Sequence, residues 1–103
     1  MNDTFKDDEI RQCVVRNIAE ALLAPPEKVV PTARLLSDLG AESIDIADIR
    51  FRLEHDFNLK IGHREMIEGL GGNLSAAEFD NRFTVQFLVD YVKRQLAEQA
   101  GKA

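Results

Sequence analysis

Hydrophobic residues recur at helical spacing in three stretches of the chain, and no stretch has the alternation typical of a β-strand. The first stretch predicts a helix from Asp7 to Leu23, which Pro25 and Pro26 end because proline lacks an amide hydrogen. The second stretch predicts a helix from Ser43 to about Asp56, and the third a helix from about Thr84 to Ala97. The pattern therefore predicts an all-α fold, a small bundle of three main helices with short helices in the connecting segments.

Two connecting segments are long but contain apolar residues. The stretch from Pro26 to Gly40 is expected to be an ordered loop that packs on the bundle, with a tight turn at Gly40. In the segment from Gly62 to Asn81 we expect a short helix from His63 to Leu70 and a capping box that begins at Ser75. The apolar residues of the second segment either widen the core, where they could also line a larger cavity, or belong to a surface hairpin of short helices. These residues are Met66, Ile67, Leu70, Leu74, Phe79 and Phe83.

The helix that begins at Ser43 has two apolar faces, although a single core can use only one of them. We assign to the core the stripe formed by Ile46, Ile49, Leu53 and Phe57. A second arc, formed by Ile44, Ala47 and Phe51, lies well away from that stripe. Such an arc predicts an exposed patch for protein contacts. The alternative is that the segment after Ile61 folds back and covers it.

Length and charge narrow the class of protein. The chain has 103 residues, enough for one domain, which we expect to span 1–103 with its core at about 7–97 and a frayed tail at 98–103. Its formal charge of -5 argues against a nucleic-acid partner and favours proteins with basic patches. The single cysteine, the polar acidic start and the absence of a long apolar run predict a cytoplasmic protein without a membrane span.

The chain offers no set of residues for catalysis or metal binding. Ser43 has no histidine base at a suitable local spacing, so an enzyme is not indicated. His55 and His63 lack partners for a metal site, and Cys13 is interpreted as a small half-buried residue. Taken alone, Ser43 would be interpreted as the N-cap of its helix.

The residues around Ser43 resemble a known family. The stretch 38–45 (Asp-Leu-Gly-Ala-Glu-Ser-Ile-Asp), followed by an amphipathic helix, is similar to the modification region of acyl carrier proteins. Family members typically carry an Asp-Ser-Leu triplet, where this chain has Glu42, Ser43 and Ile44. The loop 30–40 and the residues 84–92 also resemble the family, whereas the segment from Gly62 to Asn81 is longer than in its common form.

The resemblance implies a carrier protein with no catalytic role of its own. Ser43 would receive 4'-phosphopantetheine from a phosphopantetheinyl transferase. The chain would then hold acyl groups on this arm as thioesters and present them to acyl-loading and acyl-processing enzymes of fatty-acid, lipid or polyketide synthesis.

The same resemblance makes the exposed face of the helix that begins at Ser43 the surface that partner enzymes recognise. We expect the chain to act there as a monomer. An aminoacyl or peptidyl carrier and an unmodified helical interaction domain remain open as alternatives. The residues expected to form the recognition surface are Glu42, Ile44, Asp45, Ala47, Asp48, Phe51 and His55.

Overall fold

The computed structural model describes residues 5–101 and confirms an all-α fold over that range. Within it, the only β-type pairing is an isolated bridge between Arg34 and Thr84. The long helices α1, α2 and α5 are the three main helices that the sequence predicts. In chain order the elements are α1 (Asp7–Leu22), the 3-10 helix η1 (Pro26–Lys28), α2 (Ser43–Phe57), α3 (His63–Glu68), α4 (Ala76–Arg82) and α5 (Val85–Gly101).

The ends of the long helices differ from the predicted ends by one to four residues. α1 ends one residue early because Leu23 adopts the left-handed conformation, with φ 53°. α5 continues to Gly101, four residues past the predicted end, so 98–101 is helical rather than frayed. No proline or glycine interrupts that stretch before Gly101, and the helix therefore has no local reason to stop. Residues 102 and 103 of the expected tail lie outside the described residues.

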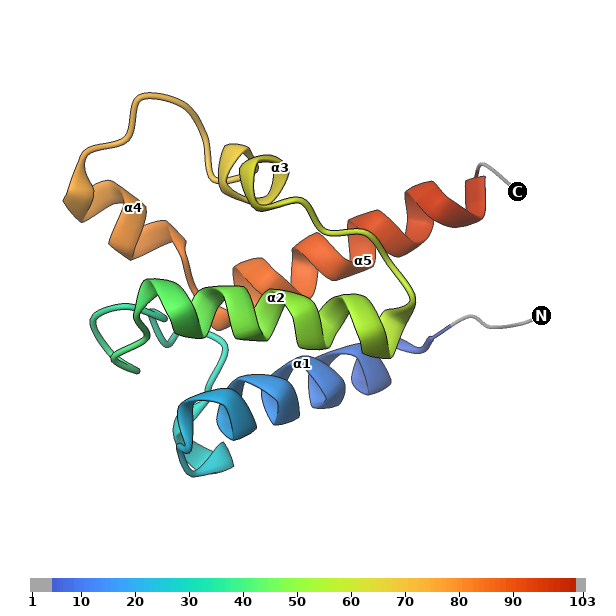
Figure 1. Ribbon diagram of the computed structural model, residues 1–103, viewed down its shortest axis with the longest axis horizontal. Coiled ribbons are helices and arrows are strands. Elements are labelled where there is room, and N and C mark those ends of the chain that lie inside the picture. The colour runs from blue at the N-terminus through green and yellow to red at the C-terminus, as the bar shows by residue number, and fades with distance from the viewer. Residues whose placement is uncertain (1–4, 102–103) are drawn as a thin grey trace.

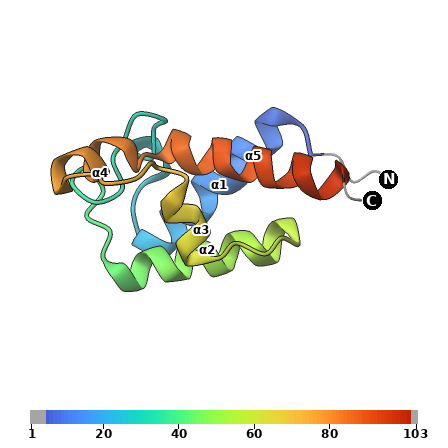
Figure 2. The ribbon, with the colours of Figure 1, turned by 90° about the horizontal axis from the view of Figure 1, so that it is seen from above.

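The hydrophobic core lies between α1, α2 and α5. α2 lies in front of α5 and above α1 in Figure 1, and Figure 2 shows α2 and α5 on opposite sides of the bundle. Each long helix contributes a stripe of buried residues at helical spacing, as the sequence predicts. These are Ile10, Val14 and Ile18 of α1, Ile46, Ile49, Leu53 and Phe57 of α2, and Val85, Leu88, Val89 and Val92 of α5.

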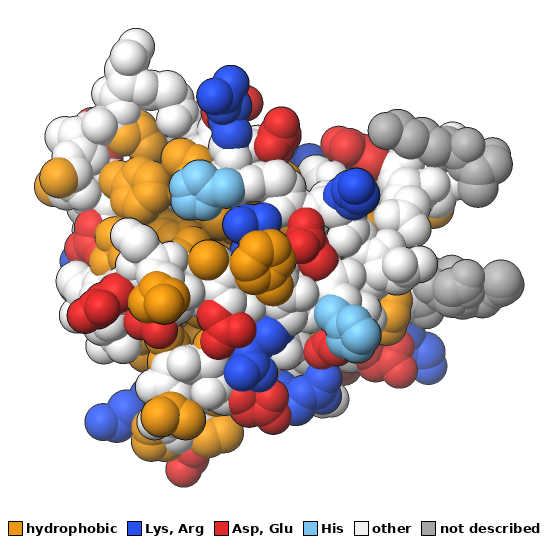
Figure 3. All heavy atoms as spheres, viewed as in Figure 1, with side chains coloured by type: hydrophobic (Ala, Val, Ile, Leu, Met, Phe, Trp, Pro, Cys, Tyr) orange, Lys and Arg blue, Asp and Glu red, His pale blue; other side chains and the backbone are white. Residues whose placement is uncertain are grey.

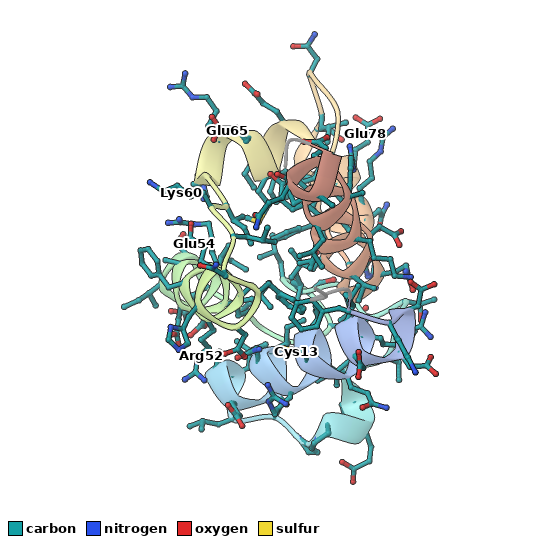
Figure 4. The ribbon with its side chains drawn as sticks, turned by 90° about the vertical axis from the view of Figure 1, so that its right-hand side faces the viewer. Cys13, Arg52, Glu54, Lys60, Glu65 and Glu78 are labelled. Carbon is teal, nitrogen blue, oxygen red and sulfur yellow. The ribbon has the colours of Figure 1, made fainter. Side chains whose placement is uncertain are left out.

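The chain that follows α2 is held against that helix at Ile61. The Ile61 amide donates a 2.7 Å hydrogen bond to Glu54 Oε2, and Arg50 Nη1 donates a 3.1 Å bond to the Ile61 carbonyl. Figure 4 shows Glu54 on α2 next to the segment that carries Lys60. Because Arg50 and Glu54 are one helical turn apart, they bind the carbonyl and the amide of the same residue, Ile61.

The helix α3 contributes to the core and is not a surface hairpin. Its Met66 is 1% exposed, and Leu70 just beyond it is also buried. α3 ends at Glu68, two residues before the predicted end, because Gly69 caps it. Of the two interpretations of this segment, the structure therefore supports the one in which it widens the core.

The short helix α4 leads into α5 through a row of aromatic rings. Its N-terminal capping box is confirmed, since Ser75 Oγ accepts from the Glu78 amide at 3.1 Å and Glu78 Oε1 accepts from the Ser75 amide at 2.9 Å. Successive ring centroids along the row lie 5.5, 5.9 and 6.0 Å apart, within the range of favourable aromatic pairs. The row consists of Phe79, Phe83, Phe87 and Tyr91.

A polar cluster joins α1 to α2 beside the core. Asn17 is buried, and its Nδ2 donates 2.9 Å hydrogen bonds to the Cys13 carbonyl and to Asp56 Oδ2. Arg16 Nη2 lies 3.2 Å from the same carboxylate oxygen. The hydrogen bond from Asn17, together with those from Cys13 and Arg16, holds the pKa of Asp56 below its usual range. The charged form of Asp56 is therefore the one that fits the folded chain.

We predict that Asn17→Ala lowers the free energy of unfolding by about 1–3 kcal/mol, because it leaves a bonded carboxylate without its main donor. Denaturant unfolding followed by circular dichroism measures this change. Arg16→Ala is the matched control: its side chain is 57% exposed, so its loss is expected to cost less than about 1 kcal/mol. Equal effects of the two substitutions would contradict the account of this cluster.

We also predict that acid destabilises the chain partly through Asp56. Because its pKa is lower in the folded chain, the unfolded chain takes up the proton more readily. Its contribution to stability is present above the pKa of the unfolded carboxyl and is lost as the pH falls through the folded pKa. Unfolding measured from neutral to acidic pH should lose less stability in Asp56→Asn than in the native chain, and identical slopes would contradict this.

Candidate functional site

Ser43 is the first residue of α2 and is exposed. The residue before it, Glu42, has an extended conformation and occupies the N-cap position. The Glu42 amide donates to Asp45 Oδ2 at 2.9 Å, so Asp45 satisfies one of the free donors at the helix start. The Ser43 hydroxyl makes no hydrogen bond to any residue in the described range 5–101. The interpretation of Ser43 as the N-cap of α2 is therefore wrong, because Glu42 occupies the N-cap position.

The loop before Ser43 brings the chain out of the core at a fixed point. Gly40 has φ +72°, a left-handed conformation that favours glycine. The next residue, Ala41, is buried, and its amide donates a 2.9 Å hydrogen bond to the Leu35 carbonyl. Ser43 follows only two residues later, so its position at the surface is set by an anchored residue.

A second set of contacts braces this loop from α4. The Ser37 amide donates to Asp80 Oδ1 at 3.2 Å, and Arg34 Nη1 donates to Asn81 Oδ1 at 3.1 Å. Arg34 also binds both carboxylate oxygens of Asp38 at 3.1 Å. The side-chain and backbone hydrogen bonds from Arg34 hold the pKa of Asp38 below its usual range. The loop is thus fixed both to the core and to α4.

An exposed hydroxyl in this position suits the attachment of a phosphodiester group. It is free of internal hydrogen bonds to the described residues, and it stands where the amides at a helix start favour a negative charge. Glu42 and Asp45 oppose such a charge, and no lysine or arginine forms an ion pair at this end of α2 within the described range. The arrangement fits a covalently held group better than a freely bound anion.

The second apolar arc of α2 is exposed, as the sequence predicts. The exposed fraction is 74% for Ile44 and 57% for Phe51, and Ala47 between them is half-buried. The segment after Ile61 does not cover these two side chains. Figure 3 shows a face of the molecule on which hydrophobic side chains alternate with acidic and basic ones.

The polar members of the predicted surface lie on the same helix in different surroundings. Glu42 and His55 are exposed, whereas Asp45 and Asp48 are half-buried. Asp48 Oδ1 accepts from Arg52 Nε at 3.1 Å, so its charge is compensated within the chain. The structure thus places all seven predicted residues on or next to α2. Glu42, at its beginning, forms no ion pair with a described residue.

Arg52 is a residue of this surface that the sequence did not predict, and it pairs with two carboxylates. Its Nη1 lies 3.2 Å from Glu20 Oε1 of α1, in addition to the bond with Asp48. The four-residue spacing of Asp48 and Arg52 is a signal in the sequence that could have revealed the first pair. Nothing in the sequence reveals the second pair, because it depends on how α1 and α2 pack.

An open groove between α1 and α2 lies beside Phe51. Figure 4 shows Cys13 and Arg52 on the two helices that form this side of the molecule. Burial raises the pKa of the Cys13 thiol, with a further rise from its hydrogen bond to Asp56. The thiol is therefore protonated and poorly nucleophilic at neutral pH. The groove is lined by Arg16, Asn17, Glu20, Phe51, Arg52, His55 and Asp56.

No group of three or more His, Cys, Asp or Glu side chains within residues 5–101 is placed to hold a metal ion. None of the described helices combines the length and the apolar character needed to cross a bilayer.

Residues 13–71, more than half of the chain, match the family described as "Phosphopantetheine attachment site". The chain is 30% identical over 93 residues to the acyl carrier protein of Thermosynechococcus vestitus, covering 90% of this chain and 99% of that one. It is 31% identical over 91 residues to the acyl carrier protein of Amoebophilus asiaticus, covering 88% and 98%.

The chain belongs to the acyl carrier protein family of phosphopantetheine-binding carriers. Proteins of this family are carriers rather than catalysts, and their cofactor is covalently bound 4'-phosphopantetheine. The matched range 13–71 contains Ser43 together with all of α2.

We predict that the two apolar faces of α2 differ in their effect on stability. Leu53→Ala removes a buried side chain and should lower the free energy of unfolding by about 2–5 kcal/mol. Phe51→Ala removes an exposed ring stacked on Arg50 and should cost less than about 1.5 kcal/mol. Denaturant unfolding measures both changes. A cost for Phe51→Ala as large as that for Leu53→Ala would mean that this ring is part of the core.

Proposed function

We propose that Ser43 is the residue that carries 4'-phosphopantetheine, and that the chain presents acyl groups on this arm to a series of enzymes. The observation that carries the proposal is the exposed Ser43 hydroxyl, free of hydrogen bonds to the described residues, two residues after the anchored Ala41. When attached, the group supplies a thiol that holds acyl intermediates as thioesters.

The residues of this chain have a positioning role in the attachment reaction. Within residues 5–101, no base accepts a hydrogen bond from the Ser43 hydroxyl, so a phosphopantetheinyl transferase has to remove its proton. Gly40, Ala41 and the contacts of Arg34 hold the hydroxyl at a fixed place on the surface. A fixed and exposed hydroxyl lowers the entropy that a transferase loses on binding it.

The exposed face of α2 is the surface that we propose for partner enzymes. Ile44 and Phe51 supply apolar contacts on the side of α2 that is exposed to solvent. Glu42 supplies a negative charge near Ser43 that no ion pair with a described residue compensates. A complementary partner has an apolar socket with a basic group close to its active site. Asp45, Ala47, Asp48 and His55 complete the proposed surface.

The proposal extends to the setting in which the carrier works. We place it in the cytoplasm as a monomer, with acyl-loading and acyl-processing enzymes of fatty-acid, lipid or polyketide synthesis as its partners. Support for the acyl type comes from the two relatives named above. Both are acyl carrier proteins, and this chain matches them along nearly their whole length.

We predict that a broad-specificity transferase and coenzyme A add one phosphopantetheine to the native chain and none to Ser43→Ala. Mass spectrometry of the intact protein measures the addition. Ser37→Ala is the matched control, because Ser37 is an exposed serine in the loop that leads to the same site. It should be modified like the native chain.

Two outcomes would contradict the proposal in different ways. Modification of Ser43→Ala would mean that another residue carries the group. Failure of several transferases to modify the native chain, with circular dichroism confirming that it is folded, would favour an unmodified interaction domain that uses the Ile44 and Phe51 surface.

A further inference from the structure

Arg50 is a half-buried arginine of α2 whose hydrogen-bonding capacity is mostly unused. Its Nη1 donates to the Ile61 carbonyl at 3.1 Å, and its guanidinium carbon lies 4.6 Å from the centre of the Phe51 ring. Its Nε is buried and has no hydrogen-bond partner among residues 5–101. Among residues 5–101, no carboxylate lies within ion-pair distance of Arg50.

The surroundings of Arg50 contrast with those of three other arginines in the bundle. Arg16, Arg34 and Arg52 each pair with at least one carboxylate. Glu54, one turn after Arg50, is bound to the Ile61 amide instead. A buried donor without a partner is costly, and native proteins retain few of them. The unused Nε therefore calls for a ligand that this chain does not itself supply.

Arg50 lies on the face of α2 that begins with Ser43. It follows Ser43 by seven residues, which is about two helical turns and about 10.5 Å along the axis. Ala47, a small residue, occupies the same face between them. Figure 3 shows hydrophobic side chains around a hollow between α2, α3 and α4 on this side of the molecule. An arm attached at Ser43 and lying along this face of α2 would pass Arg50.

We propose that the Nε–Nη2 edge of Arg50 binds a carboxylate on the acyl group that the arm carries. The inference rests on the proposed attachment at Ser43. With Nη1 bound to Ile61, the remaining edge of the guanidinium offers two parallel donors, and this fork matches the two oxygens of a carboxylate. The burial of Nε favours a small ligand within the carrier over a carboxylate on the surface of a partner protein.

The proposal predicts a preference between two cargoes of equal length. A succinyl group ends in a carboxylate, whereas a butyryl group ends in a methyl. Each can be linked to the arm through a stable amide in place of the thioester, and a transferase can then attach the arm to Ser43. Intact mass comes first, because absence of loading would refute the attachment at Ser43 and not the role of Arg50.

Nitrogen-15 NMR of the arginine side chains then measures how fast the Arg50 Nε proton exchanges with solvent. We expect exchange of the Arg50 Nε proton with solvent to slow about tenfold in the succinyl form relative to the unloaded chain, corresponding to about 1.4 kcal/mol. The butyryl form should match the unloaded chain. Equal slowing of exchange by both cargoes would mean that the arm itself is the ligand of Arg50. No slowing by either cargo would mean that the ligand of Arg50 comes from a partner protein. Either result would overturn the proposal.

A second measurement tests the site from the side of the cargo. The carboxylate of a carbon-13-labelled succinyl group should titrate at a lower pKa on the native carrier than on the Arg50→Met carrier, because the guanidinium stabilises the charged form. Arg52→Met is the matched control, since Arg52 is paired with Asp48 and Glu20 on another face of α2. An equal pKa on the native and Arg50→Met carriers, both confirmed as folded by circular dichroism, would overturn the proposal.

Discussion

The structure depends on the burial of only one face of α2. Ile49 and Leu53 are held in the core between α1 and α5, and this contact fixes how α2 is rotated about its axis. Once that rotation is set, Ile44 and Phe51 have to point away from the core. The same constraint fixes the direction of Ser43 at the first turn. A carrier needs both a firmly held helix and an accessible face, and one stripe of apolar residues provides for both.

The loop before α2 determines where that helix begins. Ala41 is anchored in the core, and Arg34 and Ser37 connect the loop to α4. The position of Ser43 therefore depends on residues that are about forty positions away in the sequence, such as Asp80. The same principle applies at the other end of α2, where α3 is tied to it through Ile61. Segments that look like connections in the sequence act as braces of the site.

The parts of the fold that follow from local patterns could be predicted from the sequence. The two faces of α2 and the capping box at Ser75 depend on spacing within one helix, and both are confirmed. The contacts of Asn17 with Asp56 and of Arg50 with Ile61 could not be predicted, because they depend on how separate elements pack. The seven residues of the proposed recognition surface lie on or next to one helix, so their proximity was predictable. The ion pair between Arg52 and Glu20 joins two helices and could not be predicted.

Charge compensation distinguishes the two ends of α2. Asp56, near the last residue of α2, is paired with Arg16, whereas Glu42 beside Ser43 forms no ion pair with any described residue. A partner that searches for negative charge is therefore guided to the end of the helix that carries the proposed attachment point.

The most direct test of the account is tandem mass spectrometry of this protein isolated from the cells that produce it. The account predicts that phosphopantetheine is found on the peptide that contains Ser43 and that fragment ions place it on this residue. A group located on Ser37 or Ser75, or a chain that is entirely unmodified in cells with an active transferase, would contradict it.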